Sequence, residues 1–364
     1  MPSSVRQEIG QLLIGSFTGQ TLPVELRALA REFDLGGVIF FSRNLDVPEQ
    51  VAELSFESEA LGVALPAWVS VDQEGGRVAR LREPFTRWPP MATLGRADDE
   101  ALARRFAHAL ADELLAVGIT LDYAPVLDIH TNPANPVIGD RALAGNAAAV
   151  ARLGAVLVEA LQARGLAACG KHFPGHGDTS TDSHLELPLV EHPPDRLRAV
   201  EFEPFRAAIA AGVASIMTAH VLVPSLDDAR PATLSPAIVM RLLREELGFE
   251  GVIISDDLEM KAVSARYAVP DAAVEAIRAG CDAVLVCSGD CDLQGRTLEA
   301  LVRAVEEGRI TRARLDDALR RGRAAKTRFL AGARPALGAR VRALRAHVGR
   351  DEHQAIAQEM AAFL

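Results

Sequence analysis

The segment Lys171–His184 reads KHFPGHGDTSTDSH and places three histidines, two aspartates and a lysine close together. It follows the small apolar run GLAACG, which indicates a buried strand. Pro174, Gly175 and Gly177 are incompatible with a continuous helix, so the segment is predicted to be a long polar loop at a strand end. Groups that titrate near neutral pH, gathered on one loop, indicate a candidate active site.

A second acidic group closes the apolar stretch GVIISDDLEM, residues 251–260. Asp256 closes this largely apolar stretch, so we expect its side chain to lie partly out of water, where burial is tolerated if the group is hydrogen-bonded or functional. Asp182 and His184 are two residues apart, which places both on one side of an extended loop. The aspartate could then orient an imidazole that gives and takes back a proton.

Ionisable side chains also follow other apolar runs of the chain: Asp72, Glu74, Arg77 and Arg80 after the third, Asp140 and Arg141 after the fourth, and His220 after the sixth. Each has an ordinary structural explanation. Glu74 and Arg80 could form a solvated ion pair. Arg141 could cap a helix, and His220 could be a buried histidine with satisfied hydrogen bonds. It is their coincidence at so many predicted strand ends that favours a functional site.

Short apolar runs alternate with helical stretches along the chain, at Leu12–Phe17, Gly36–Phe40, Ala67–Asp72, Ile119–Pro125, Leu166–Lys171, Ala214–His220, Gly251–Asp256 and Asp282–Cys287. Continuous rather than alternating apolar runs are typical of parallel strands covered on both faces. The unbroken βα order predicts right-handed crossovers, and eight strands favour a closed (β/α)8 TIM barrel over an open doubly wound sheet. No GxGxxG motif follows the first run, which also disfavours a dinucleotide-binding fold.

Capping residues mark the helices between these runs. Helices are predicted at Ala101–Val117, from a cap at Asn146 to Gly165, from a cap at Ser235 with Pro236 as first helical residue to Gly248, at Asp271–Ala279, and after a cap at Thr311. The pattern changes after a Gly/Pro break. We therefore predict a barrel domain over residues 1–330 and a C-terminal helical extension over residues 331–364.

Composition limits the classes of function. The chain has 364 residues, 49% of them hydrophobic, and a formal net charge of −10. That charge gives no general attraction for nucleic acid or an anionic membrane. The N-terminal sequence has no signal-peptide pattern and no apolar stretch could span a bilayer, so a cytoplasmic protein is expected. The four cysteines lack the paired spacing of a zinc site and are interpreted as free thiols of a reducing compartment.

Four blocks of the sequence, VDQEGGRVAR, NPVIGDRAL, KHFPGHGDTSTDSHLELP and GVIISDDLEM, together resemble glycoside hydrolase family 3, in its bacterial β-N-acetylglucosaminidase branch. The resemblance extends from about Gly10 to about Phe329. Two-domain relatives carry a further sandwich domain, for which this chain is too short. The resemblance implies Asp256 as nucleophile, His184 as acid/base assisted by Asp182, and sugar binding by Asp72, Arg80, Arg141, Lys171 and His172. It assigns no chemical step to His176 and implies no cofactor and no metal.

The implied reaction is removal of terminal β-linked GlcNAc with retention of configuration, through a covalent glycosyl-Asp256 intermediate. Cytoplasmic members of the branch act on muropeptide fragments during cell-wall recycling, so the expected partner is a small sugar substrate, with the enzyme as a monomer. A histidine base is neutral and repels an anionic acceptor less than a carboxylate would. Phosphate in place of water, giving a phosphorylase, therefore stays open, as does a β-glycosidase of other specificity.

Two rival interpretations come from other classes of protein. A metal-dependent barrel hydrolase could use His172, His176, His184 and Asp256, which are ligand types that zinc accepts, but their spacing matches no ligand signature. A catalytically inactive sugar-binding barrel has less support, because neither Asp256 nor His184 is substituted.

Overall fold

Each of the eight apolar runs forms a strand in the computed structural model, which describes residues 4–183, 185–332 and 335–364. The strands are β1 (Leu13–Gly15), β2 (Gly37–Phe40), β3 (Trp68–Val71), β4 (Leu121–Asp122), β5 (Ala167–Phe173), β6 (Ser215–Thr218), β7 (Val252–Asp257) and β8 (Ala283–Val286). All pairs are parallel and follow chain order, and Ile14 of β1 pairs with Leu285 of β8. The sheet is therefore a closed barrel, and the predicted (β/α)8 fold is confirmed.

Alternate strand residues belong to two separate apolar cores. On β2, Val38 and Phe40 join the large core, whereas Ile39 joins a smaller one. The smaller core takes residues from all eight strands and is the barrel interior, and the larger one lies between strands and helices. This explains why the strands read as continuous apolar runs, since both faces are buried.

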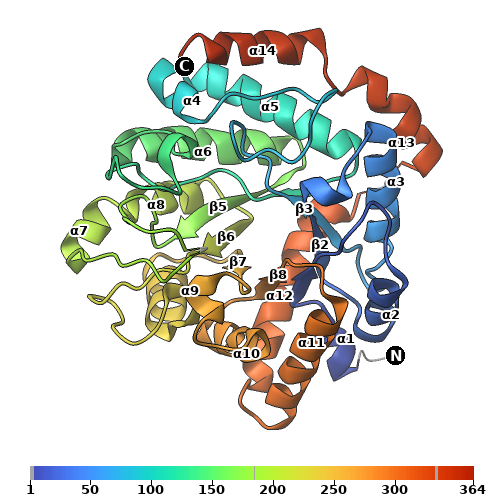
Figure 1. Cartoon of the computed structure of the whole chain (residues 1–364), viewed down its shortest axis with the longest axis vertical. Helices are drawn as coiled ribbons and strands as arrows, with labels where there is room; N and C mark the ends of the chain where they lie inside the picture. Colours follow the sequence, from blue (N-terminus) through green and yellow to red (C-terminus); the bar gives the residue numbers. More distant parts are fainter. Residues whose placement is uncertain (1–3, 184, 333–334) are drawn as a thin grey trace.

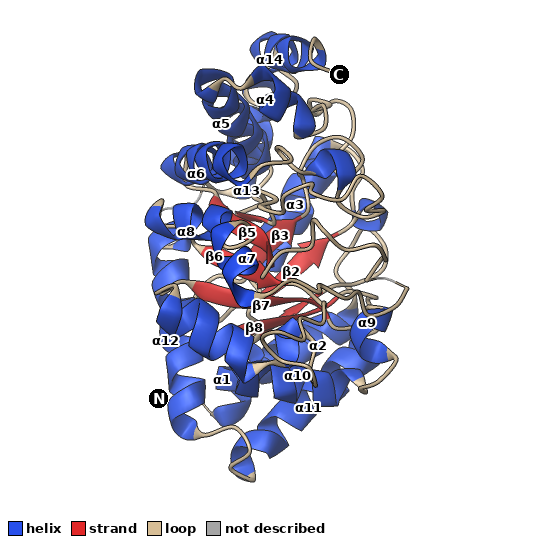
Figure 2. Cartoon of the chain, turned by 90° about the vertical axis from the view of Figure 1, so that its left-hand side faces the viewer, coloured by secondary structure: helices blue, strands red, loops and turns tan. Residues whose placement is uncertain are grey.

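Helices surround the strands on the outside (Figure 2). They are α1 (Val5–Gly10), α2 (Val24–Phe33), α3 (Pro48–Glu59), α4 (Ala92–Ala97), α5 (Glu100–Ala116), α6 (Ala147–Ala163), α7 (Pro194–Ala199), α8 (Glu203–Ala210), η4 (Ala237–Glu246), α9 (Lys261–Ser264), α10 (Val269–Ala279), α11 (Cys291–Glu306), α12 (Arg312–Leu330), α13 (Leu337–Ala343) and α14 (Asp351–Ala361). Short 3₁₀ turns lie at η1 (Ser42–Asn44), η2 (Gly139–Arg141), η3 (Ala232–Leu234) and η5 (Leu344–Ala346).

The predicted caps largely hold. The side chain of Asn146 accepts a hydrogen bond from the backbone N–H of Ala149, and that of Thr311 accepts one from Arg314. The hydroxyl of Ser235 accepts from the backbone N–H of Ile238 at 3.3 Å and Pro236 is helical, as predicted, but the helix then winds as a π-helix over Ala237–Glu246.

After α12 the chain forms the helices α13 and α14 on one side of the barrel (Figure 1). Helix α13 contacts α3, and α14 contacts α4 and α5. The division into a barrel over 1–330 and an extension over 331–364 stays our proposal. Within the described part of the chain, no helix has the length and apolar character needed to cross a membrane.

Candidate active site

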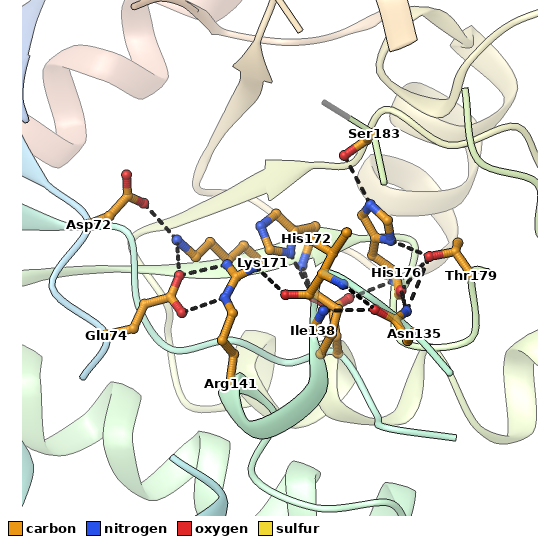
Figure 3. A network of polar contacts seen from close by, with 12 residues as sticks. Asp72, Glu74, Asn135, Ile138, Arg141, Lys171, His172, His176, Thr179 and Ser183 are labelled. Carbon is orange, nitrogen blue, oxygen red and sulfur yellow. Dashed lines mark hydrogen bonds and ion pairs between the residues drawn. The ribbon is translucent and has the colours of Figure 1, made fainter. Parts of the chain in front are cut away.

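A buried lysine joins two of the predicted site segments at the barrel mouth. Lys171 lies near the carboxyl end of β5, and its side chain is 2% exposed. Its Nζ lies 2.7 Å from Oδ1 of Asp72 and 2.6 Å from Oε1 of Glu74, both in the segment after β3 (Figure 3). A buried ammonium is tolerated where carboxylates neutralise it. The expected meeting of polar residues from separate strand ends is thus observed.

Glu74 does not pair with Arg80, so the solvated ion pair that the sequence left open is not formed. Its two carboxylate oxygens accept from Nε and Nη2 of Arg141, each at 2.8 Å, in a bidentate pair (Figure 3). Arg80 contacts Asp72 instead, at 3.4 Å, and its guanidinium lies 5.7 Å from the ring centroid of Phe41. Arg141 is therefore not a helix cap but is held rigidly by a buried acid.

Opposite charges keep this cluster ionised. Burial alone would raise the pKa of Glu74, but Lys171 and Arg141 together lower it. Burial would likewise raise the pKa of Asp72, and Lys171 with Arg80 lowers it. Burial lowers the pKa of Lys171, and the two carboxylates more than reverse this. Fixed charged groups at the rim of a cavity make strong, directional hydrogen bonds to neutral hydroxyls.

His172 is oriented by an aspartate after β4. Its Nδ1 lies 2.6 Å from Oδ2 of Asp128, which is 1% exposed. The other oxygen of Asp128 accepts from the backbone N–H of His176 at 2.6 Å. Because Asp128 holds Nδ1, the remaining ring nitrogen of His172 is the one left for a substrate.

β7 ends in two adjacent aspartates, Asp256 and Asp257. The backbone N–H of Asp257 donates to Oδ1 of Asp256 at 2.8 Å, and both side chains are half-buried. Nε2 of His220 lies 2.9 Å from the carbonyl oxygen of Asp257, and its Nδ1 lies 2.8 Å from the hydroxyl of Thr233. His220 is fully buried and braces the strand end, which agrees with the structural interpretation.

The chain matches the family described as Glycosyl hydrolase family 3 N terminal domain over residues 4–323. It belongs to glycoside hydrolase family 3. A Thiobacillus denitrificans protein named beta-hexosaminidase is 43% identical over 260 residues, which are 70% of this chain and 72% of that protein. A Nitrosomonas eutropha protein of the same name is 40% identical over 286 residues, 77% of this chain and 81% of its own.

Solved family 3 structures are similar along the whole chain. A Paenibacillus beta-N-acetylglucosaminidase superimposes with a TM-score of 0.93 at 43% identity, covering 100% of this chain and 69% of that one. NagZ from Neisseria gonorrhoeae, in complex with N-trifluoroacetyl-D-glucosamine, gives a TM-score of 0.79 at 34% identity and covers 97% of each chain.

The family 3 site is described except at one predicted residue. His184 lies outside the described residues, so its predicted role stays a prediction. Asp182 is half-buried, and its carbonyl oxygen accepts from the backbone N–H groups of Leu185 and Glu186, at 2.9 and 3.1 Å. Asp72, Arg80, Arg141 and Lys171 meet in one cluster, and their role in sugar binding stays a prediction.

Sequence reasoning gave no role to Asp128 and Asn135, and it named Glu74 at a strand end without giving it a role in the site. Asp128 lies in the loop after β4, so a search of the whole loop, and not only of the strand end, could have found it. Asn135 gave no signal, because its importance comes from one bond to another loop: its side-chain amide donates to the carbonyl of His176 at 2.8 Å, while its Oδ1 accepts from the nearby N–H of Ile138 at 2.8 Å.

His172 and His176 are engaged in hydrogen bonds rather than grouped as metal ligands. Among residues 4–183, 185–332 and 335–364, no three His, Cys, Asp or Glu side chains are arranged to hold a metal ion.

Proposed function

We propose that this family 3 protein is a retaining exo-β-N-acetylglucosaminidase, a β-N-acetylhexosaminidase that hydrolyses terminal β-linked GlcNAc. The carrying observation is the cluster of Asp72, Glu74, Arg141 and Lys171 at the barrel mouth, fully charged and held by mutual ion pairs. Similarity to proteins named beta-hexosaminidase supports the identity of the sugar.

In this proposal Asp256 attacks the anomeric carbon and the glycosidic C–O bond breaks. His184 gives its proton to the leaving oxygen, so that the aglycone departs as an alcohol and a glycosyl-Asp256 ester remains. His184 then takes a proton from water, whose oxygen displaces Asp256 from the anomeric carbon. Two inversions give net retention. Asp182 stabilises the imidazolium that forms in the second step.

The charged cluster would hold the sugar ring. Asp72 accepts hydrogen bonds from hydroxyls, Arg80, Arg141 and Lys171 donate to their oxygens, and the ring nitrogen of His172 that Asp128 leaves free bonds a further hydroxyl. Because each of these groups is already fixed by a protein partner, little side-chain entropy is lost on binding.

We further propose that the natural substrates are muropeptide fragments bearing terminal GlcNAc, processed in the cytoplasm. All four cysteines are free thiols, which fits a reducing compartment. Binding needs no partner other than the sugar, and the proposed enzyme acts as a monomer.

The test is hydrolysis of an aryl β-GlcNAc by the wild type, with and without phosphate, with the sugar product identified. Free GlcNAc of retained β configuration, formed at a rate that phosphate leaves unchanged, is expected. Asp256→Ala should lose turnover by about a thousandfold or more, because no other group can form the ester.

Other products would change the assignment. GlcNAc 1-phosphate with a faster rate would make the enzyme a phosphorylase. Turnover of aryl β-glucoside or β-xyloside instead of β-GlcNAc would overturn the substrate and keep the mechanism. Loss of activity with a chelator, restored by a metal, would support a metal-dependent hydrolase.

A further inference from the structure

His176 is a buried residue of the polar loop to which the proposed chemistry gives no step. Both of its ring nitrogens meet hydroxyl groups of the same loop. Nδ1 lies 2.7 Å from Oγ1 of Thr179, and Nε2 lies 3.1 Å from Oγ of Ser183 (Figure 3). One imidazole therefore spans the two sides of the loop.

The barrel side of this contact is fixed by the backbone. The N–H of His176 donates to Asp128 at 2.6 Å, and its carbonyl accepts from the side-chain amide of Asn135 at 2.8 Å. At the next residue, a Cβ added to Gly177 would lie 1.8 Å from the carbonyl oxygen of Ile129. The loop after β5 thus packs closely against the loop after β4. These contacts fix the backbone of His176.

The other side of the contact is Ser183, which is 2% exposed. Its carbonyl oxygen accepts from the backbone N–H of Ala262 at 3.1 Å. Ala262 lies in α9, directly after the strand that carries Asp256. Ser183 is therefore bonded through its side chain to His176, nearer the start of the same loop, and through its backbone to the segment after β7.

The imidazole can serve both hydroxyls because it is neutral. Burial lowers the pKa of His176 to about 4. In a neutral imidazole one nitrogen donates and the other accepts, and a hydroxyl can complement either. The contact with Ser183 therefore persists over the pH range in which a histidine acid/base would work.

We propose that His176 is a positioning residue, whose hydrogen bond to Ser183 fixes the loop end that carries Asp182 and His184. The inference deepens the proposed function, on which it rests, since it assumes that these two residues supply and remove the proton. Ser183 stands between them in the sequence. A displaced Ser183 would misplace both neighbours without touching the sugar-binding cluster around Lys171.

The test uses variants that separate the two ring contacts. Ser183→Ala removes only the hydroxyl. His176→Gln places an amide near the position of Nε2 and keeps the reach to Ser183, whereas His176→Asn keeps only the reach to Thr179. We expect Ser183→Ala and His176→Asn to lower kcat/KM on aryl β-GlcNAc about ten- to a hundredfold, as small misplacements of catalytic groups do, and His176→Gln to restore much of the loss.

The leaving group makes the readout specific for positioning. Protonation matters little for an acidic phenol and greatly for a poor leaving group. The loss should therefore grow as the phenol becomes less acidic, while inhibition by GlcNAc itself stays unchanged. Ser180→Ala, the same change at an exposed hydroxyl of the loop, is the matched control and should behave as wild type.

Amide hydrogen exchange of residues 178–186 provides a measurement that does not depend on activity. Faster exchange in Ser183→Ala and His176→Asn, with wild-type exchange in Ser180→Ala, is expected. Unchanged exchange overturns the proposal even if the wild type proves inactive on GlcNAc, which would count against the proposed function alone. Equal losses on good and poor leaving groups would also overturn it.

Discussion

Two adjacent aspartates at the end of β7 have different surroundings. Burial raises the pKa of Asp257 to about 7, and the nearby carboxylates of Glu259 and Asp256 add to the shift. Its Oδ1 accepts from the backbone N–H of Glu259 at 3.1 Å. Asp257 thus adds little negative charge next to the proposed nucleophile below neutral pH.

The raised pKa predicts how Asp257 affects stability. Between pH 3.8 and about 7 the folded state holds a proton on Asp257 that the unfolded chain has lost, so this contribution falls as pH rises through 7. Asp257→Asn keeps the acceptor and has no charge to bury. We expect the variant to match wild type near pH 4 and to be more stable at pH 8, by urea unfolding.

The exposed Asp228→Asn change is the control for loss of one charge. A difference between Asp257→Asn and wild type that does not vary with pH would show that Asp257 ionises normally in the folded protein.

At the site, the sequence predicted what depends on local pattern and did not predict contacts between residues far apart in the chain. Position at a strand end follows from local pattern, and this was enough to bring Asp72, Arg141 and Lys171 into one predicted set. Partner choice depends on loop conformations that no local pattern fixes. The sequence therefore left the partner of Glu74 open, with Arg80 as one alternative, and gave Asp128 no role.

At the level of elements, prediction succeeded where periodicity is strong. All eight strands were predicted, because parallel strands in a barrel are buried on both faces and read as unbroken apolar runs. The π-helix at residues 237–246 was not, since its sequence carries the same amphipathic pattern as an α-helix. The way in which the last helices fasten to the barrel was also unpredictable, because it depends on contacts between residues far apart in the sequence, among them those of one buried acid.

That acid is Glu113 of α5, which is 2% exposed. Its Oε1 accepts from the hydroxyl of Thr86 at 2.7 Å and from the N–H of Gly349 at 2.9 Å, and lies 3.0 Å from Nδ1 of His353. Its Oε2 accepts from the N–H of Thr86. One carboxylate thus joins α14 to the segment after β3, in which Arg80 lies.

Glu113→Gln should destabilise the protein, because the amide turns a donor toward one of the N–H groups that the carboxylate satisfies. We expect a loss of about 1–3 kcal/mol in the free energy of unfolding, typical of a buried polar group left unpaired. KM should also rise, since the segment that presents Arg80 is loosened. Urea unfolding and steady-state kinetics measure the two effects.

Glu100→Gln on the exposed start of the same helix is the control, with a loss under about 1 kcal/mol. If Glu113→Gln unfolds at the wild-type midpoint, the last helices are not fastened through this residue.

Viewed as a whole, the barrel separates its chemistry from its stability. The charged cluster lies at the carboxyl ends of the strands, whereas the opposite end is closed by α12, whose Leu330 joins the interior core. Lys326 of α12 is buried there, 2% exposed, and donates to Oε1 of Gln11 at 2.8 Å. Burial lowers the pKa of Lys326 to about 7, and only Asp34 opposes the shift.

Lys326 should therefore reduce stability at neutral pH. Between about 7 and its ordinary value of 10.5, the unfolded chain binds a proton that the folded protein does not, so stability from this residue rises with pH. The sign of this pH dependence is opposite to that of Asp257, and the two pH ranges meet near pH 7.

Lys326→Met cannot take up the proton. Its stability relative to wild type should be greatest below pH 7 and decline steadily toward pH 10, whereas the exposed Lys261→Met should show no such trend. Urea unfolding at several pH values measures this, and a constant difference would mean that the lysine ionises in the fold as it does in water.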